Sequence, residues 1–242
     1  MIPTARDIAA AVWVTWPGEA TVPTEAFTLR RSGDDSRRSR AATANRAVSD
    51  AEIATAAATM RGWGQPALFW VPGDAPEFEA QLSTLGYTAH DASWYYGAPV
   101  SVLAARTPPR ISTFEIWEPL AIMSEIFAAT GTSHGRQNVM ARADCPKTTI
   151  LGRVDAKPAG VAYVGAHGPL AMVHGVGVLP QHRRKGLAAH MMAQAAIWAE
   201  RQGCTWIGLA VGQGNEGACA LYASLGMEAV GSYHYRTLPE QP

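Results

Sequence analysis

The sequence predicts a mixed α/β fold, in which a twisted, mostly antiparallel sheet is flanked by helices. Two observations support this class: strand-like segments pair as a hairpin in the second half, and strand-like and helix-like segments then alternate to the end of the chain. The chain has 242 residues, of which 48% are apolar and 17% charged. It can therefore bury a substantial core, as one large domain or two small ones.

The second half of the chain is predicted in most detail. The turn at 155–158 joins two strands as a hairpin. The long helix has an apolar stripe at helical spacing (Leu187, Met191, Ala195 and Trp198), and Gly203 stands where a helix-ending glycine is expected. The expected elements are a helix-rich stretch at 118–143, strands at 148–154, 160–164 and 171–179, a helix at 185–202, a strand at 205–211, a short helix at 216–225 and a strand at 228–236.

The first half repeats part of this order. A helix at 51–60, a strand at 66–71, a short helix ending before Gly86 and a strand at 94–96 are expected. Leu85-Gly86-Tyr87 here and Leu225-Gly226-Met227 later each precede a final strand, which indicates an old duplication. Independent use of a glycine helix cap is the alternative.

A linker is predicted at 107–112. The paired prolines Pro108 and Pro109 cannot continue a helix or a central strand. This places an N-terminal domain at 1–106 and a C-terminal domain at 113–242.

Composition excludes several classes of protein. Lys and Arg total 20 and Asp and Glu total 20, so neither nucleic acid nor an acidic membrane surface is expected as a partner. The three cysteines (Cys145, Cys204 and Cys219) share no C-x-x-C spacing, so no disulfide framework or metal site is expected. No signal peptide and no apolar run long enough to span a membrane is visible. We expect a cytoplasmic protein, and the scarcity of lysine is typical of a GC-rich bacterial genome.

The segment from Val176 to Ala188 carries the clearest chemistry. It joins a strand to the start of the long helix, where the amides of 184–188 lack partners within the helix. Three cations, Arg183-Arg184-Lys185, oppose the helix dipole there. A bound pyrophosphate would resolve that conflict; a solvated charge cluster is the alternative.

Two motifs in this half resemble those of the GCN5-related N-acetyltransferases (GNATs). The first, Arg183-x-x-Gly186-x-Ala188, is similar to the family's acyl-CoA signature. The second, which resembles the family's later half-motif, is Asn215-x-x-Ala218-x-x-Leu221-Tyr222-x-x-x-Gly226-Met227. The match covers 148–236 well and 111–147 loosely. The resemblance implies a GNAT fold in two tandem halves, with a degenerate N-terminal half and a catalytic C-terminal one.

The resemblance also implies roles for single residues. Acetyl-CoA is the expected co-substrate, and Tyr222 is expected to protonate the departing thiolate; a buried structural tyrosine is the alternative. The Val176 amide would polarise the thioester carbonyl. The residues expected to bind acetyl-CoA are Val176, Val178, Arg183, Arg184, Lys185, Gly186, Leu187, Ala188 and Asn215.

The general base is less clearly marked. Many relatives place a glutamate on the central strand, but this sequence has none between Val161 and Pro180. His174 lies two residues before Val176, on the same strand face, and its pKa suits general-base work. An ordered water held by His174, or a purely structural core histidine, are the alternatives.

The expected function is transfer of an acetyl group to a primary amine, by direct attack in a ternary complex. The acceptor is a small amine or a peptide amine, and the loop 131–136 and His234 are expected to line its pocket. The alternative is a non-catalytic acyl-CoA-binding or regulatory module. A G-x-G-x-x-G match at 212–217 is rejected as a dinucleotide site, because only 25 residues follow it.

The first half contains no R-x-x-G-x-A motif, so it is expected to lack an acyl-CoA site. Packing, formation of a homodimer or shaping of the acceptor pocket are its expected roles. A cluster of arginines around Asp34-Asp35 is expected to decorate a solvated hairpin turn. Its members are Arg30, Arg31, Arg37, Arg38 and Arg40.

Overall fold

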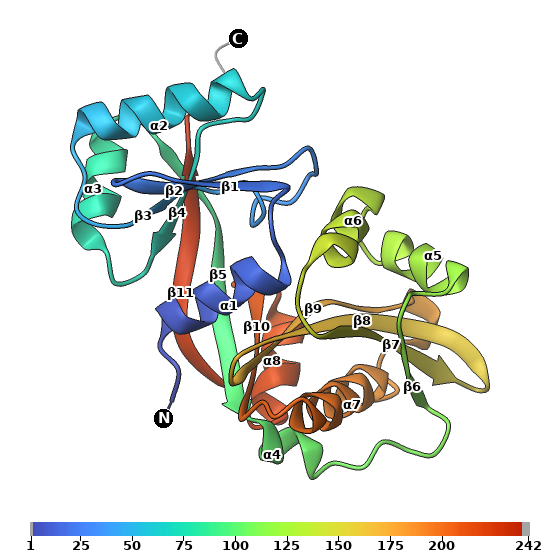
Figure 1. Ribbon diagram of the computed structural model, residues 1–242. Helices are drawn as coiled ribbons and strands as arrows, with labels where there is room; N and C mark the ends of the chain where they lie inside the picture. Colours follow the sequence, from blue (N-terminus) through green and yellow to red (C-terminus); the bar gives the residue numbers. More distant parts are fainter. Residues whose placement is uncertain (1, 239–242) are drawn as a thin grey trace.

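The computed structural model describes residues 2–238 and forms two lobes joined by long strands (Figure 1). The first lobe holds a three-stranded sheet, and strands from the whole chain build a second sheet of eight strands. The elements of the first half are α1 (Ala5–Thr15), β1 (Ala20–Pro23), β2 (Phe27–Arg31), β3 (Thr43–Ala44), α2 (Asp50–Gly62), β4 (Leu68–Pro72), α3 (Pro76–Thr84), β5 (Thr88–Pro99) and α4 (Val100–Ala104).

The second half follows the predicted order closely. The hairpin, the long helix and the alternating strands and helices are all present, and the mixed, mostly antiparallel class is confirmed. The elements are β6 (Thr113–Ile116), α5 (Ala121–Ala129), α6 (His134–Arg142), β7 (Lys147–Val154), β8 (Lys157–His167), β9 (Leu170–Val178), a 3-10 turn (Pro180–His182), α7 (Leu187–Arg201), β10 (Trp206–Gly212), α8 (Glu216–Ser224) and β11 (Glu228–Thr237).

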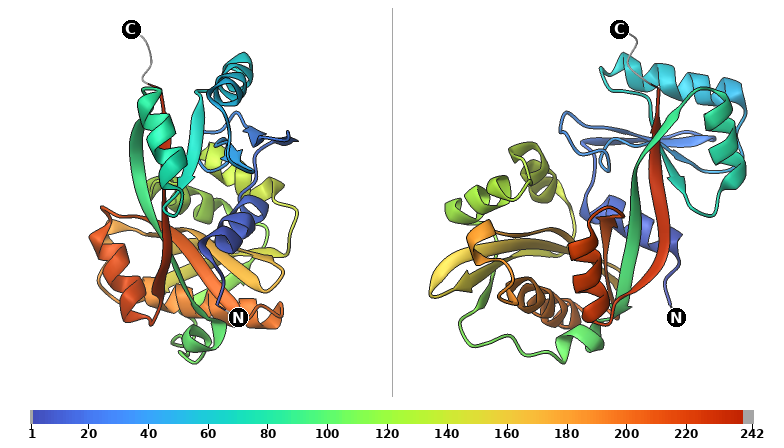
Figure 2. Two further views of the ribbon diagram at one scale, coloured as in Figure 1. Left: turned by 90° about the vertical axis from the view of Figure 1, so that its left-hand side faces the viewer. Right: turned by 180° about the vertical axis from the view of Figure 1, so that it is seen from behind.

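The two halves exchange their last strands within the large sheet, whose order is β4-β11-β5-β10-β9-β8-β7-β6. β5 lies between β10 and β11, and β11 lies between β4 and β5, with antiparallel pairing throughout this region. Figure 2 shows β5 and β11 running side by side between the lobes. No helix or strand covers 105–112, but the sheet continues across this connection, so the division into 1–106 and 113–242 stays a prediction.

The order β4-α3-β5 repeats the order β10-α8-β11. The strand before each unit also pairs in the same sense: β9 is parallel to β10, and Ala42, just before β3, forms a parallel bridge with Phe69 of β4. The chain therefore consists of two tandem halves of one architecture, as the repeated glycine caps indicate.

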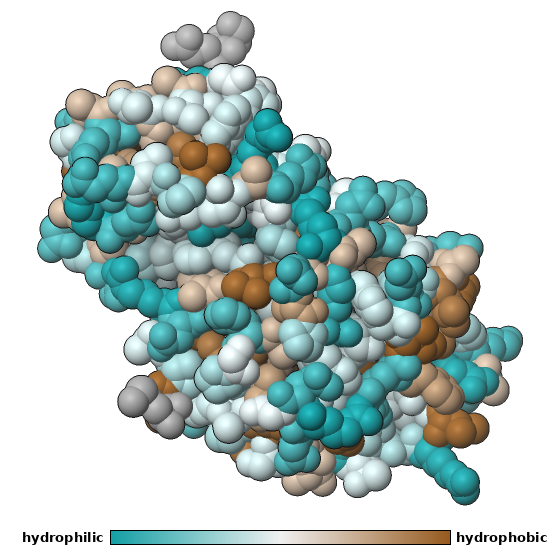
Figure 3. Space-filling view, viewed as in Figure 1, coloured by the Kyte–Doolittle hydropathy of each residue, from teal (hydrophilic) through white to brown (hydrophobic). Residues whose placement is uncertain are grey.

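Helices cover both faces of the sheet in the second half. α7 packs on one face, with Leu187, Met191 and Ala195 in the core, so the apolar stripe of this helix is buried as predicted. α1 and α5 pack on the opposite face of β8 and β9. The surface carries brown, hydrophobic side chains near β6 and α5 (Figure 3), where Trp117 and Leu120 are exposed.

Within residues 2–238, no helix is both long enough and apolar enough to cross a membrane.

Candidate active site

A gap in strand pairing opens the sheet between β9 and β10. Their parallel pairing ends at Val173 and Leu209, although both strands continue beyond that point. A bulge in the pairing of β9 with β8 adds to the opening: the register shifts between Val161 and Tyr163, and Gly175 has a φ of 60°. Gly175 and Val176 therefore have no partner in either register. An extended ligand could pair with this edge as an added strand does.

The opening leads to the start of α7. A 3-10 turn at Pro180–His182 follows β9, and Arg184 and Gly186 then take left-handed conformations, with φ of 63° and 77°. The amides of residues 184–189 donate no hydrogen bond within residues 2–238, and Gly186 caps the helix without a side-chain contact. These amides and the positive end of a 15-residue helix form a site suited to an anion.

The cations of the turn are exposed and only loosely paired. Lys185 Nζ lies 3.3 Å from Asp155 Oδ2, and both side chains are at least half exposed. Arg183 Nε donates to the Val178 carbonyl at 3.1 Å, and the Arg183 amide already donates to Pro180. Since exposed pairs of this kind contribute little stability, the side chains are free to meet a phosphate.

Tyr222 of α8 is 6% exposed and belongs to the core cluster against which Val176 and Val178 of β9 pack. Its ring packs against that of Tyr96, with centroids 6.1 Å apart, while its hydroxyl makes no hydrogen bond within residues 2–238. Burial, and then the neighbouring Cys219, raises the pKa of Tyr222 to about 12. The phenol therefore keeps its proton at neutral pH and can donate it.

The remaining residues predicted to bind acetyl-CoA have defined positions. Val178 pairs with Gly160 of β8, and Leu187 points into the core, so only its amide faces the turn. Asn215 caps α8, where its Oδ1 accepts from the Ala218 amide at 3.2 Å. The structure thus brings β9, the turn and α7 into one continuous site, with Asn215 at the end of β10.

A cavity of about 280 Å³ lies at the mouth of the opening. His174 and Gly175 of β9 and Gly212 of β10 form one part of its wall. The other part comes from the first half of the chain and includes Trp16 and Arg38. The first half of the chain therefore forms part of the wall of this cavity.

Comparison with known proteins agrees with this geometry. Residues 115–227 match the model of the acetyltransferase (GNAT) family. The chain carries a GNAT-family domain. The arrangement of the whole chain is similar to that of a GCN5-related N-acetyltransferase from Kribbella flavida, at 22% identity and a TM-score of 0.76 over 100% of this chain and 98% of that one.

Other relatives match more distantly. A tandem GNAT protein from the clavulanic acid biosynthesis pathway has a TM-score of 0.61 at 14% identity, over 89% of this chain and 78% of that one. An aminoglycoside N(6')-acetyltransferase type 1 from Acinetobacter haemolyticus is 35% identical over 60 residues, which are 25% of this chain and 41% of that protein. A second, from Acinetobacter baumannii, is 34% identical over 58 residues, 24% of this chain and 40% of its own length. The chain thus spans about two fifths of these curated relatives.

The first half lacks the free helix amides and the tyrosine that the GNAT domain has at its anion site and in α8. At the start of α2, Ser49 and Glu52 form a capping box, in which each side chain accepts from the backbone of the other's residue. The amides of Ser49 and Glu52 are thus occupied, and a carboxylate lies at the start of the helix, where it would repel a phosphate. In the repeated helix-end sequence, Leu82 also takes the place of Tyr222.

His174 is held at both ring nitrogens. Its Nδ1 lies 3.2 Å from Arg38 Nη1, and its Nε2 lies 2.9 Å from Thr15 Oγ1. An arginine can only donate, so Nδ1 accepts and Nε2 carries the proton. Thr15 in turn donates to the Ala11 carbonyl at 2.9 Å. Burial, and then the Arg38 cation, holds the pKa of His174 well below its ordinary value. The single lone pair of this imidazole is therefore already engaged.

The expectation of a solvated hairpin turn fits only part of the arginine cluster: Arg31 and Arg37 are exposed, whereas Arg30 is buried. The loop 32–40 lies in the long connection between β2 and β3, which pair antiparallel, and its polar side chains at 32, 34, 36 and 39 fold inward. Arg30 is 4% exposed, and its guanidinium lies 4.0 Å over the Trp13 ring. The sequence marks the charges of this segment but not their burial, because the partners that bury them come from distant elements.

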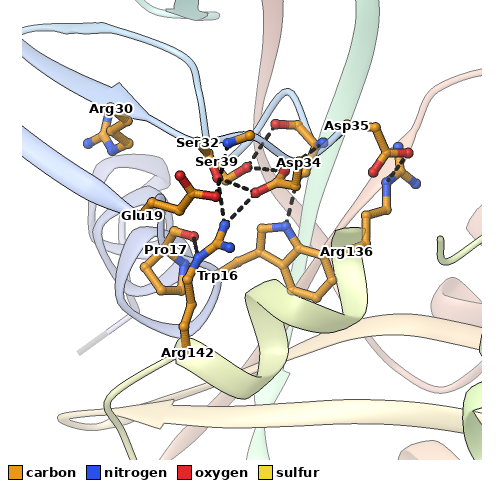
Figure 4. Close-up of polar contacts among 12 residues, drawn as sticks. Trp16, Pro17, Glu19, Arg30, Ser32, Asp34, Asp35, Ser39, Arg136 and Arg142 are labelled. Carbon is orange, nitrogen blue, oxygen red and sulfur yellow. Dashed lines mark hydrogen bonds and ion pairs between the residues drawn. The ribbon is translucent and has the colours of Figure 1, made fainter. Parts of the chain in front are cut away.

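Asp34 holds the inward fold of the loop (Figure 4). It is 6% exposed; its Oδ1 accepts from the Ser36 amide at 2.8 Å and from Ser39 Oγ at 2.6 Å. Its Oδ2 accepts from Ser32 Oγ and from Arg142 of α6. Burial alone would raise the pKa of Asp34, but these hydrogen bonds hold it below its ordinary value. The carboxylate thus ties the first half to the GNAT domain.

The loop 131–136 contributes to the pocket through Thr132 and Arg136, as expected. His234 does not line the cavity; its Nε2 lies 2.6 Å from Glu79 Oε2 instead. Sequence reasoning missed Arg38, Thr15 and Asp91 as site residues. The cluster of arginines was a sequence signal for Arg38, whereas no local sequence pattern indicated Thr15 or Asp91.

Proposed function

We propose that the protein transfers the acetyl group of acetyl-CoA to a primary amine, by direct attack within a ternary complex. The observation that carries this proposal is the unpaired stretch of β9, which runs from the cavity to the unsatisfied amides of residues 184–189. One linear ligand with a phosphate end and a reactive end fits such a site. The GNAT family uses acetyl-CoA, and the matched segment contains the whole stretch.

Each part of the site has a role in this reaction. The amides of the turn and of α7, with Arg183, Arg184 and Lys185 around them, bind the pyrophosphate. The exposed edge of β9 pairs with the pantetheine arm, and the Val176 amide donates to the carbonyl oxygen as charge develops there. Asn215 presents its amide group to the arm at the end of β10.

The chemical step forms one bond and breaks one. The neutral amine attacks the thioester carbon, the C–N bond forms and the C–S bond breaks. Tyr222 gives its proton to the leaving sulfur, since its hydroxyl has no other hydrogen-bond partner within residues 2–238. The amine gives its proton to water in the cavity, and the Tyr222 phenolate takes a proton back from that water, so the enzyme returns to its starting state.

His174 is the proton acceptor that the sequence predicts. The hydrogen bond from Arg38 to its lone pair supports a different proposal, in which His174 is a positioning residue. A His174→Ala variant separates the two roles. An unchanged pH–rate profile with a raised KM for the amine supports positioning, whereas loss of the acidic limb of the profile supports the base.

The amides of residues 184–189 form the proposed pyrophosphate cradle, and its test uses the two glycines that flank α7. Gly186 precedes the helix and Gly203 follows it, and both have φ near 78°, so a side chain strains the backbone equally at each. A ligand at 100 times its dissociation constant stabilises a protein by about 2.7 kcal/mol. We expect acetyl-CoA to raise the melting temperature of the native protein and of Gly203→Glu, but not of Gly186→Glu.

The control for this test is the melting temperature without ligand, which shows that each variant folds. Equal stabilisation of both variants by acetyl-CoA would mean that the cradle lies elsewhere. The non-catalytic alternative predicts the same binding, so it must be distinguished by turnover.

A further inference from the structure

The cavity beside the gap contains an arginine without a carboxylate partner. Three arginines and one aspartate line it: Arg37, Arg38, Arg136 and Asp91. Arg37 Nη1 lies 2.6 Å from Asp91 Oδ2, and Arg136 Nε lies 3.7 Å from Asp35 Oδ2. Arg38 has no carboxylate within 4 Å among residues 2–238; its guanidinium contacts the rings of His174 and Tyr233 instead.

The surroundings of Arg38 make its charge costly. It is partly buried and lies among rings, with Trp16, Tyr233 and Tyr235 lining the same cavity. A guanidinium cannot lose its proton at physiological pH, so the protein holds a permanent, unneutralised cation there. Because this cation lines the cavity, it is positioned to pair with an anionic group of a molecule that enters the cavity.

The position of Arg38 is fixed by neighbours from both halves. His174 accepts from it on one side, and Thr15 of α1 fixes the tautomer of His174 that can do so. The loop that carries Arg38 is tied to α6 through Asp34 and Arg142. A guanidinium held in this way is preorganised for a planar anion, which it binds with two parallel hydrogen bonds.

The distance to the expected reaction centre suits a small molecule. His174, which contacts Arg38, precedes Val176 by two residues with the bulge at Gly175 between them, so their Cα atoms lie at most roughly 7 Å apart. The cavity of about 280 Å³ is at the small end of the usual range for ligand pockets. An anion on Arg38 and an amine at the thioester can therefore belong to one compact acceptor.

The same charge helps to prepare the nucleophile. A cation close to an ammonium group lowers its pKa, because the neutral form is then favoured. By pairing with the anionic group of the acceptor, Arg38 would cancel the negative charge that otherwise favours the ammonium form, and so shift the bound amine toward its reactive, unprotonated state. An acceptor with several ammonium groups, such as an aminoglycoside, would be repelled.

We propose that the acceptor is a small amine that carries an anionic group, a carboxylate or a phosphonate, and that Arg38 binds this group. The inference rests on the proposed acetyl transfer and names its substrate class. A free amino acid has this chemistry, and so does an aminophosphonate. The two acceptors differ in their anion, because a phosphonate is larger and tetrahedral whereas a carboxylate is planar.

The test compares acceptors that differ in one group. L-leucine, L-leucinamide, the phosphonate analogue of leucine and an aminoglycoside are offered with acetyl-CoA, and N-acetyl product is quantified by mass spectrometry. We expect kcat/KM to be at least about tenfold higher for an anionic acceptor than for the amide, since a charge-assisted hydrogen bond is lost. The anionic acceptor with the higher kcat/KM, leucine or its phosphonate analogue, identifies which of the two anions the pocket prefers.

Variants assign the preference to Arg38. In Arg38→Met the preference should vanish, with a loss of about 10- to 100-fold in kcat/KM for the anionic acceptor only. Arg31→Met is the matched control, because Arg31 is an exposed arginine of the adjoining strand β2 and should retain the preference. Acetyl-CoA should stabilise both variants as it stabilises the native protein.

Equal rates for leucine and leucinamide, faster aminoglycoside acetylation, or a preference that survives Arg38→Met would each overturn the inference and leave acetyl transfer standing. Binding separates the two proposals further. If no amine is acetylated, but N-acetyl-leucine with CoA stabilises the native protein and not Arg38→Met, the pocket assignment holds and the transfer proposal fails.

Discussion

At the scale of single residues, the site depends on which polar atoms already have partners. The lone pair of His174 is occupied by Arg38, while the hydroxyl of Tyr222 has no hydrogen-bond partner within residues 2–238. The two residues that the sequence assigns to proton transfer, Tyr222 as the acid and His174 as the candidate base, therefore differ in the structure. The phenol is available to the reaction, and the imidazole supports the pocket.

Replacement of Tyr222 by Phe removes the proposed acid and keeps the buried ring. We expect kcat to fall by about 10²- to 10⁴-fold, the usual contribution of a general acid, while the dissociation constant of acetyl-CoA stays within a factor of two or so, since the cradle is untouched. Steady-state kinetics and calorimetric titration measure the two quantities. Tyr96→Phe, in the ring that packs against Tyr222, is the control. An unchanged kcat in Tyr222→Phe would remove this residue from the mechanism.

At the scale of elements, the sequence predicted what local patterns encode. The long helix, the glycine before it and the hairpin follow from periodicity and turn chemistry, so the cradle could be predicted. The bulge at Gly175 and the inward fold of 32–40 could not, because they depend on β8 and on Arg142 of α6. The loop nevertheless supplies Arg38, so this part of the pocket is found only in the structure.

The tie between the loop and α6 should depend on pH. The folded pKa of Asp34 is lowered, so its contribution to stability is complete above its unfolded pKa, about 3.9, and is lost as pH falls through the folded value. We expect Asp34→Asn to lower the free energy of unfolding at pH 7 by about 2 to 4 kcal/mol. Urea unfolding from pH 7 to pH 2.5 should show this difference shrinking below pH 4.

The control for the tie is Asp35→Asn, because the Asp35 side chain is more than half exposed and lies 3.7 Å from Arg136. It should change the free energy of unfolding by less than about 1 kcal/mol. A difference between the native protein and Asp34→Asn that stays constant down to pH 2.5 would show that the Asp34 carboxylate does not stabilise the fold through its charge.

At the scale of the whole molecule, the two halves are inseparable in the sheet. β5 completes the sheet of the GNAT domain beside β10, and β11 returns to pair with β4. The repeated glycine caps indicated two related halves, but pairing between distant strands cannot be deduced from local patterns, so the exchange was not predicted. As a result, the first half, which has no cradle of its own, forms one wall of the pocket that lies beside the cradle of the second half.

The most direct test of the account measures CoA release and N-acetyl product together, with purified full-length protein, acetyl-CoA and the leucine and leucinamide pair. We expect CoA and N-acetyl product to form in equal amounts. The rate should be higher for leucine than for leucinamide, and it should depend on Tyr222. Saturable binding of acetyl-CoA, with CoA release no faster than in buffer for every amine, would contradict acetyl transfer and leave the protein as an acyl-CoA-binding module.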